Sequence, residues 1–197
     1  MEAEAPARAG SLVLVHGPAR GGKSRWAEAL LKDITPVTYV ATSPGRPQDA
    51  RWQERLRLHR MRRPDHWALL EAGPDLPQDL KRVPGNHAVL IDALGGYVAR
   101  HLDSDSNIWD RQTERLLSQL STMGQTCVLV IEETGWGVVP PTAIGGLFRD
   151  RLGALAQRLD RQAVASWLVV QGRALDLHAL GVPVSYTHLT LPTKRIV

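Results

Sequence analysis

Eight consecutive residues near the start of the chain have the types and spacing of a phosphate-binding loop. Residues 17–24 read Gly-Pro-Ala-Arg-Gly-Gly-Lys-Ser, which matches G-x-x-x-x-G-K-S. The loop follows an apolar run, Leu12 to Val15, and precedes a helix-like stretch, Arg25 to Leu31. This strand–loop–helix context aims backbone N–H groups and the positive end of a helix at a phosphate. We therefore predict a nucleoside triphosphate site here, in preference to a plain tight turn before a helix.

Each part of the loop has an expected task in binding the triphosphate. Its glycines permit backbone angles that other residues avoid, so that successive N–H groups turn toward an anion. Lys23 is expected to reach the β- and γ-phosphates, and the Ser24 hydroxyl to ligate Mg²⁺. The predicted nucleotide-binding stretch consists of Gly17, Pro18, Ala19, Arg20, Gly21, Gly22, Lys23 and Ser24.

A second candidate for metal binding is Asp92, which ends the apolar run Ala88 to Ile91. A strand that closes on an acidic residue suits the second element of a phosphate-loop enzyme, which holds Mg²⁺ directly or through water. The alternative is structural, because an aspartate at a strand end often caps the following helix. The loop's own need for Mg²⁺ favours the metal role.

A histidine lies in the most basic segment of the chain, on a stretch predicted to be helical. Arg55, His59 and Arg62 or Arg63 fall on one helix face at spacings of three and four. Nearby guanidinium groups disfavour the imidazolium, and a neutral imidazole can attack phosphorus as a nucleophile. The alternative is a surface histidine without a chemical role, since charge runs usually form solvated helix faces.

Three glutamates follow predicted strands and have two interpretations. Glu132 and Glu133 come after Cys127–Ile131 and before a glycine-hinged loop, where carboxylates can orient a water or hydroxyl, or bind a ribose or base. Glu71 follows a weaker strand candidate, Trp67–Leu70, with the same ambiguity. The alternative for all three is an exposed carboxylate at a strand end.

Composition restricts the class of protein. The chain has 197 residues, 43% of them hydrophobic and 22% charged, which suits one soluble α/β domain with a full core. A single cysteine excludes a disulfide framework, and the histidines show no ligand spacing with it, so no zinc site is expected. No apolar stretch is long enough to cross a membrane and no signal peptide is visible, so we expect a cytoplasmic protein.

The net charge of +4 comes with arginines concentrated between Arg46 and Arg63. Attraction of triphosphates, nucleic-acid binding and a solvated helix surface all explain such a cluster. No aromatic-interleaved RNA-binding pattern or zinc-finger spacing accompanies the arginines, so nucleic acid is not expected as a partner.

Short apolar runs alternate with helical patterns along the chain, which predicts a mainly parallel central sheet flanked by helices. Together with the phosphate loop, we expect an α/β P-loop NTPase fold of the RecA-like type. Because strand ends of a parallel sheet meet at one edge, the loop, Asp92 and the Glu132–Glu133 pair should converge. The expected strands are Leu12–Val15, Val37–Ala41, Trp67–Leu70, Ala88–Ile91, Cys127–Ile131 and Trp167–Val170. The expected helices are Lys23–Lys32, Asp49–Arg62, Leu94–Leu102, Ile108–Met123 and Ile144–Gln162.

The expected organisation is a single domain with two irregular ends. Residues 1–10 are expected to form a flexible arm, and residues 11–184 one P-loop α/β domain. Leu180–Val184 is interpreted as a final strand or turn. Residues 185–197 are interpreted as a disordered tail or a non-native extension, to which we assign no function.

Five segments in order carry a resemblance to a known family. Residues 17–25 resemble G-G-x-R-S-G-K-S-R, and residues 37–42 resemble a second strand with Y-I-A-T. Residues 55–67 resemble R-I-x-x-H-r-x-x-R-P-x-x-W, residues 132–140 resemble N-E-V-G-x-G-I-V-P, and residues 148–157 resemble F-R-D-x-x-G-x-x-N-Q. Together they resemble the bifunctional adenosylcobinamide kinase / adenosylcobinamide-phosphate guanylyltransferase family of cobalamin biosynthesis.

The resemblance implies two reactions with a corrinoid substrate, Mg²⁺ and the nucleotides ATP and GTP. The first phosphorylates the aminopropanol hydroxyl of adenosylcobinamide with ATP or GTP. The second transfers GMP from GTP to that phosphate through a guanylylated histidine, which matches His59, and yields adenosylcobinamide-GDP. Glu71 matches a glutamate associated with nucleotide binding, and Glu133 matches the glutamate of N-E-V-G. The resemblance also implies a trimer and a histidine-bearing helix that moves relative to the phosphate loop.

The chain departs from the family pattern mainly at hydrogen-bonding side chains, which matter most for recognising the nucleotide or the corrinoid. The departures include Arg51 for Glu, Gly95 for Thr, Tyr97 for Trp, Arg100 for Asn, Glu132 for Asn, Thr134 for Val and Ala156 for Asn. Two alternatives therefore stay open beside the bifunctional enzyme. One is a kinase-only relative or another small-molecule P-loop kinase, and the other is a divergent, non-catalytic nucleotide-binding protein.

Overall fold

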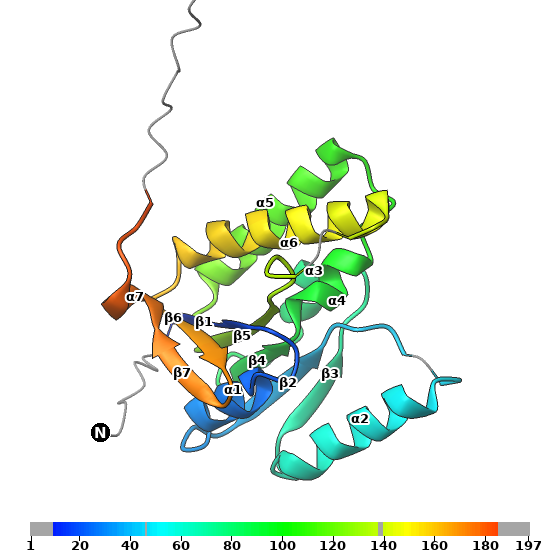
Figure 1. The fold of residues 1–197 in the computed structure, drawn as a ribbon. Coiled ribbons are helices and arrows are strands. Elements are labelled where there is room, and N and C mark those ends of the chain that lie inside the picture. Colours follow the sequence, from blue (N-terminus) through cyan, green and yellow to red (C-terminus); the bar gives the residue numbers. More distant parts are fainter. Residues whose placement is uncertain (1–9, 46, 138–139, 185–197) are drawn as a thin grey trace, which may run out of the picture.

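The computed structural model describes residues 10–45, 47–137 and 140–184, apart from the side chain of Arg55. Within these residues a seven-stranded sheet has the order β3-β2-β4-β5-β1-β6-β7, in which only β7 is antiparallel to its neighbour (Figure 1). The predicted class, an α/β P-loop fold with a mainly parallel sheet flanked by helices, is confirmed. Apart from Gly10, the predicted arm and the predicted tail lie outside the described residues.

The strands form at the continuous apolar runs, because strands in the middle of a parallel sheet are covered on both faces. The strands are β1 Leu12–Gly17, β2 Val37–Ala41, β3 Ala68–Glu71, β4 Ala88–Asp92, β5 Cys127–Glu132, β6 Ala165–Val170 and β7 Arg173–Asp176. The helices are α1 Lys23–Leu30, α2 Ala50–Arg62, α3 Leu76–Leu80, α4 Leu94–Ala99, α5 Ser106–Thr122, α6 Ala143–Asp160 and α7 Leu177–Leu180.

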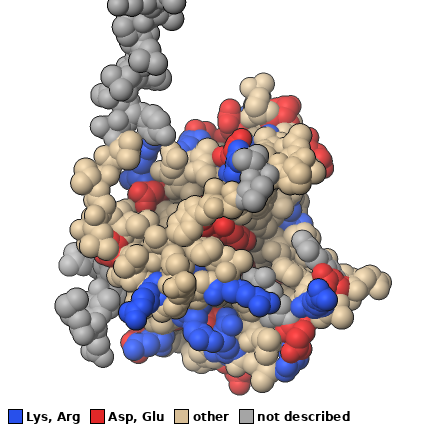
Figure 2. Space-filling view, in the orientation of Figure 1, with Lys and Arg blue, Asp and Glu red and all other residues tan. Residues whose placement is uncertain are grey.

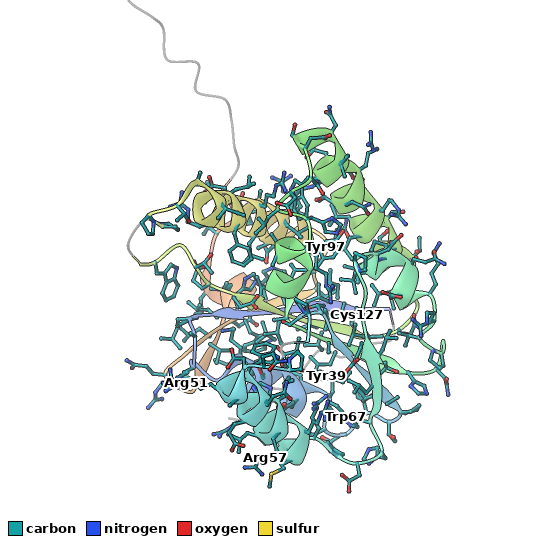
Figure 3. All side chains as sticks on the ribbon, turned by 90° about the vertical axis from the view of Figure 1, so that its right-hand side faces the viewer. Tyr39, Arg51, Arg57, Trp67, Tyr97 and Cys127 are labelled. Atoms are coloured by element: carbon teal, nitrogen blue, oxygen red, sulfur yellow. The ribbon has the colours of Figure 1, made fainter. Side chains whose placement is uncertain are left out.

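Two hydrophobic cores lie on opposite faces of the sheet. Successive strand residues point to opposite faces, so Leu14 of β1 joins one core and Val15 joins the other. Helices α3, α4, α5 and α6 cover the first face, and α1 and α2 lie on the second (Figure 1). Figure 3 shows Tyr97 among the helices of the first face and Tyr39 between α2 and the sheet. The nucleotide-loop helix and the histidine helix therefore share one side of the sheet.

The C-terminal part of the described chain differs from the prediction. The segment Leu180–Val184, expected to be a final strand or turn, is not a strand, since the last strand is β7 and Leu180 ends the short helix α7. β7 is an edge strand whose residues alternate in exposure, so it produces no apolar run. The short α3, which starts at the Asp75 cap, was not predicted either. None of the helices in the described residues is both long and apolar enough to cross a membrane.

Candidate active site

The phosphate loop is held against the turn between β6 and β7. Gly17 ends β1 with φ 146°, and a Cβ there would collide with the carbonyl oxygen of Val169. A Cβ on Gly21 would come within 2.6 Å of the same oxygen, and the Gly21 carbonyl accepts a hydrogen bond from the N–H of Gly172 at 2.8 Å. Gly21 is therefore required for close approach and not for a left-handed backbone, which Arg20 adopts instead with φ 61°.

Lys23 and Ser24 open helix α1 directly after the loop. The helix follows Gly22, which has φ 109°, so the N–H groups of its first turn point out of the helix end toward the loop. Lys23 is buried, and its Nζ donates a hydrogen bond to the carbonyl of Pro18 at 2.8 Å. The ammonium thus lies across the loop, in the position from which a phosphate group can be met.

Asp92 ends β4, and its side chain is 9% exposed. The following helix α4 has Ala93 at its N-cap and no side-chain cap, so Asp92 does not have the capping role considered above. Its Oδ2 accepts a hydrogen bond from the Tyr39 hydroxyl at 3.2 Å. Burial, aided by the negative Asp92, raises the pKa of Tyr39, so the phenol keeps its proton and remains a donor. The Asp92 carboxylate is therefore oriented by β2.

His59 lies on α2 with its Nδ1 at 3.9 Å from Oδ2 of Asp92, and its side chain is 18% exposed. Nη2 of Arg62 is 3.5 Å from the same ring nitrogen, as the helical spacing predicted. Arg63 turns away, since its Nε donates to the carbonyl of His59 and its guanidinium lies 3.7 Å from the centre of the Tyr39 ring. The imidazole is thus placed between a cation and a carboxylate, and the sequence argument had included only the cations.

One cavity of about 1060 Å³, between α1, α2 and the carboxyl ends of β4 and β5, is lined by residues 20–24 of the loop together with His59, Arg62 and Asp92. Its charged or nucleophilic lining residues are Arg20, Lys23, Ser24, Arg25, Asp49, Arg51, Glu54, His59, Arg62, Asp92 and Glu132. Figure 2 shows one face of the molecule, on which Lys and Arg side chains gather over α1 and α2. A cavity of this size and charge suits a polyanionic ligand with a bulky organic group.

Of the predicted nucleotide-binding residues, Gly17, Pro18 and Ala19 at the start of the loop and the two glutamates Glu71 and Glu133 do not line this cavity. Glu71 is exposed at the end of β3, in register with Ala41 of β2. Glu133 lines a separate cavity of about 480 Å³ beside α6, and its Oε1 accepts a hydrogen bond from the N–H of Gly135 at 2.5 Å. The predicted convergence therefore holds for the loop, Asp92 and Glu132, whereas the other member of the glutamate pair lies elsewhere.

Sequence reasoning missed the residues that orient the site. Tyr39, which holds Asp92, was signalled only by its place in the 37–42 motif. Glu28 pairs with Arg62 at 3.1 Å and joins α1 to α2, and no pattern in the sequence indicates this pair. Burial raises the pKa of Glu132, which the N–H of Gly95 and the charge of Lys23 partly offset.

A comparison with protein-family models decides the relationship. Residues 13–177 match the model described as CobU, cobinamide kinase / cobinamide phosphate guanyltransferase. The chain belongs to this family. It is 34% identical over 176 residues to the bifunctional adenosylcobalamin biosynthesis protein CobU of Escherichia coli (strain K12), covering 82% of this chain and 96% of that protein. It is also 34% identical over 167 residues to CobP of Pseudomonas aeruginosa (strain PAO1), covering 83% and 95%.

Solved structures resemble this CobU-family chain at low sequence identity. A protein of Pyrococcus horikoshii OT3 has a TM-score of 0.52 at 8% identity, covering 86% of this chain and 87% of its own. A KaiC-like protein of the same organism has a TM-score of 0.48 at 16% identity, covering 82% and 72%. The first likeness concerns the fold alone. The family relationship is what connects this chain with cobinamide kinase and cobinamide phosphate guanyltransferase activity.

Proposed function

We propose that this CobU-family enzyme phosphorylates adenosylcobinamide with ATP or GTP and then transfers GMP from GTP to the product through His59, giving adenosylcobinamide-GDP. The observation that carries the proposal is the 3.9 Å separation of His59 Nδ1 and Asp92 Oδ2 at the mouth of the phosphate loop. A potential nucleophile and a potential metal ligand are therefore within reach of the same triphosphate.

In the guanylyl transfer, an imidazole nitrogen of His59 attacks the α-phosphorus of GTP. The new N–P bond forms as the bond to the β-phosphate oxygen breaks, and pyrophosphate leaves. The loop N–H groups and Lys23 hold the departing charge, while Arg62 is close enough to stabilise the attacked phosphoryl group. The phosphate of the acceptor then displaces the histidine, which regenerates the free imidazole.

Mg²⁺ fits the oxygen atoms of this cavity. The Ser24 hydroxyl and the Asp92 carboxylate both line it, and Mg²⁺ in phosphoryl-transfer sites is held by one or two such groups together with phosphates and water. Ser24 and Asp92 would hold the ion, which when bound neutralises charge on the phosphates. The Tyr39 hydroxyl keeps the carboxylate turned into the cavity.

The proposal retains Glu71 and Glu133 as nucleotide-binding residues, on the strength of the family motifs and not of the cavity lining. It also includes a homo-oligomer, a trimer by family resemblance. Glu71 is exposed at the edge of the described sheet, where a neighbouring chain or the distal part of a nucleotide can reach it.

Labelled GTP tests the covalent step. The enzyme is incubated with Mg²⁺ and GTP labelled in both the α-phosphate and the guanine. Wild type and the control His66→Ala should carry both labels in an acid-labile, alkali-stable form, whereas His59→Ala should carry neither. His66 is an exposed histidine that follows the same helix, so its loss controls for general effects.

A second assay of the same proteins, with adenosylcobinamide and a nucleotide labelled in the γ-phosphate, separates the alternatives. Transfer of the γ-phosphate to adenosylcobinamide that persists in His59→Ala fits the bifunctional enzyme. Transfer by a wild type that never takes up the GMP label would leave a kinase only. Tight nucleotide binding with neither product would leave a non-catalytic binding protein, and the proposal would be wrong.

A further inference from the structure

The smaller cavity, of about 480 Å³, takes no part in the chemical steps proposed above, although one of its lining residues, Glu133, is among the residues proposed to bind nucleotide. It lies at the carboxyl ends of β1 and β5 beneath α6, and its polar lining consists of His16, Glu132, Glu133, Thr134, Arg149, Asp150 and Gln157. His16 Nε2 is buried and has no hydrogen-bond partner among the described residues. Burial lowers the pKa of His16, so near neutral pH its ring is uncharged and can exchange a hydrogen bond with a ligand.

Glu132 is the residue that the two cavities share. It lines both the smaller cavity and the larger one that holds the phosphate loop. Its strand position is fixed, because β5 pairs with β1 and Glu132 lies in register with Gly17, the first residue of the loop. A group bound in the smaller cavity therefore meets the triphosphate site at this carboxylate.

The chain makes room for this carboxylate at Gly95. Oε2 of Glu132 accepts a hydrogen bond from the N–H of Gly95 at 2.8 Å, and a Cβ at Gly95 would lie only 2.6 Å from that oxygen. Gly95 and Glu132 therefore fit each other: the absent side chain at 95 leaves room for the carboxylate at 132.

We propose that the smaller cavity binds the hydroxyl-bearing arm of the acceptor, and that Glu132 accepts the hydroxyl proton as the oxygen attacks the γ-phosphorus. This inference rests on the proposed function. The acceptor oxygen forms the new O–P bond, the bond from the γ-phosphorus to the β,γ-bridging oxygen breaks, and the nucleoside diphosphate leaves. The proton passes to a carboxylate oxygen of Glu132 and from there to solvent.

The chemistry of the lining suits an amide-linked alcohol. The side-chain amide of Gln157 and the ring of His16 can pair with an amide group, while Glu132 accepts from the hydroxyl. The volume of the cavity is at the small end of ligand sites, so it takes an arm and leaves a macrocycle outside. The carboxylate of Asp92 in β4 and the ammonium of Lys23 in α1 act on Glu132 from the larger cavity.

Glu132→Gln separates proton transfer from packing. The amide oxygen still accepts the hydrogen bond from Gly95, but the side chain no longer takes up a proton. Two reactions are measured with the full-length enzyme and Mg²⁺: guanylylation of His59 by GTP, which involves no acceptor, and γ-phosphate transfer to adenosylcobinamide. We expect guanylylation within about twofold of wild type, and a kinase kcat at least about 100-fold lower with little change in the KM for ATP, the size of a lost general base.

Ala156→Leu tests the cavity itself. Ala156 lines the smaller cavity and not the larger one, so a longer side chain should obstruct the acceptor arm without touching the triphosphate. We expect the KM for adenosylcobinamide to rise about tenfold or more, a loss equal to about 1.4 kcal/mol of binding, with guanylylation unchanged.

The outcomes distinguish failure of this inference from failure of the proposed function. If wild type transfers the γ-phosphate and Glu132→Gln does so at a similar kcat, Glu132 is not the proton acceptor and this inference fails alone. If Glu132→Gln loses guanylylation as well, the carboxylate serves the nucleotide site, which also overturns it. If the KM for adenosylcobinamide is unchanged in Ala156→Leu, the arm of the acceptor does not bind in this cavity. Absence of any transfer by wild type overturns the proposed function itself.

Discussion

The phosphate loop and helix α2 meet at the same cavity but are held in the fold by different contacts. The loop is fixed by backbone: Gly17 and Gly21 pack against Val169, and Lys23 is buried beneath the loop. None of the described side chains of α2 is buried, although the helix carries the candidate nucleophile His59. The half of the site proposed to hold phosphate is built into the sheet, whereas the half proposed to attack it lies on a helix without buried side chains among the described ones.

The magnitudes of the contacts support this division. The contacts of α2 include the partly exposed pair Arg62–Glu28, and Arg63 at its end stacks on Tyr39. Such contacts contribute about 0–1 and about 0.5–1 kcal/mol respectively, whereas each apolar side chain buried under α1 contributes about 1.5–3 kcal/mol. These two contacts of α2 are therefore individually weaker than the apolar burial that holds α1 in place.

The largest expected effect comes from removing the Lys23 side chain from the phosphate loop. In Lys23→Ala the loop loses the ammonium that we propose meets the β- and γ-phosphates, so kcat/KM should fall on the order of 10²–10³-fold for both γ-phosphate transfer and histidine guanylylation. The matched control is Lys32→Ala, whose side chain is 72% exposed beyond the other end of α1. A Lys23→Ala enzyme that loses only one of the two reactions would contradict a shared loop.

An intermediate effect is expected from His16, which precedes the loop on β1. Because burial depresses its pKa below 6.5, the folded protein keeps the ring neutral while the unfolded chain takes up a proton. This contribution to stability is complete above pH 6.5 and is lost as the pH falls toward the folded pKa. The loss amounts to about 1.4 kcal/mol for each pH unit by which the pKa of the folded state lies below that of the unfolded chain.

Urea unfolding between about pH 5 and pH 7.5 measures this contribution, since a histidine titrates in that range. The free energy of unfolding of wild type should decline toward the acid end, and His16→Gln should decline less. If the free energy of unfolding changes equally with pH in the two proteins, protonation of His16 does not destabilise the fold.

The same division explains how far the sequence alone can predict the molecule. Apolar runs located β1, β2, β4, β5 and β6 to within about two residues, since burial on both faces of a sheet leaves a direct mark on composition. Parallel order then brings the loop and Asp92 to one edge, which is why their proximity was predictable. The edge strand β7 is not covered on both faces, so its residues form no continuous apolar run.

Contacts between side chains were not predictable in the same way. Arg62 and Arg63, which flank His59 near Asp92, contact Glu28 and Tyr39. Because an arginine can pair with many kinds of side chain, the sequence does not indicate which partner each one takes. The pair Glu132 and Glu133 shows the other limit. Successive residues at a strand end diverge, so one carboxylate joins the triphosphate cavity and the other does not, and only the structure distinguishes them.

The smallest expected effect tests whether α2 is attached as weakly as its contacts indicate. Removing the Arg62–Glu28 pair by Glu28→Gln should lower the rate of His59 guanylylation about two- to fivefold, the equivalent of a partly exposed ion pair of at most about 1 kcal/mol. The kinase reaction, which does not use His59, should change less. The control is Arg57→Ala, which breaks the exposed Arg57–Glu54 pair within α2 and leaves the attachment to α1 intact.

Arg62 also lies 3.5 Å from His59, so Arg62→Ala alone does not distinguish attachment of the helix from direct action on the phosphoryl group. The double variant does. If Arg62 acts by holding α2 to Glu28, then Arg62→Ala, Glu28→Gln and the double variant should lose guanylylation by similar factors, because one contact is removed each time. A far larger loss in Arg62→Ala, unchanged by adding Glu28→Gln, would assign the arginine to the chemistry and leave the attachment of α2 to Arg63 and Tyr39.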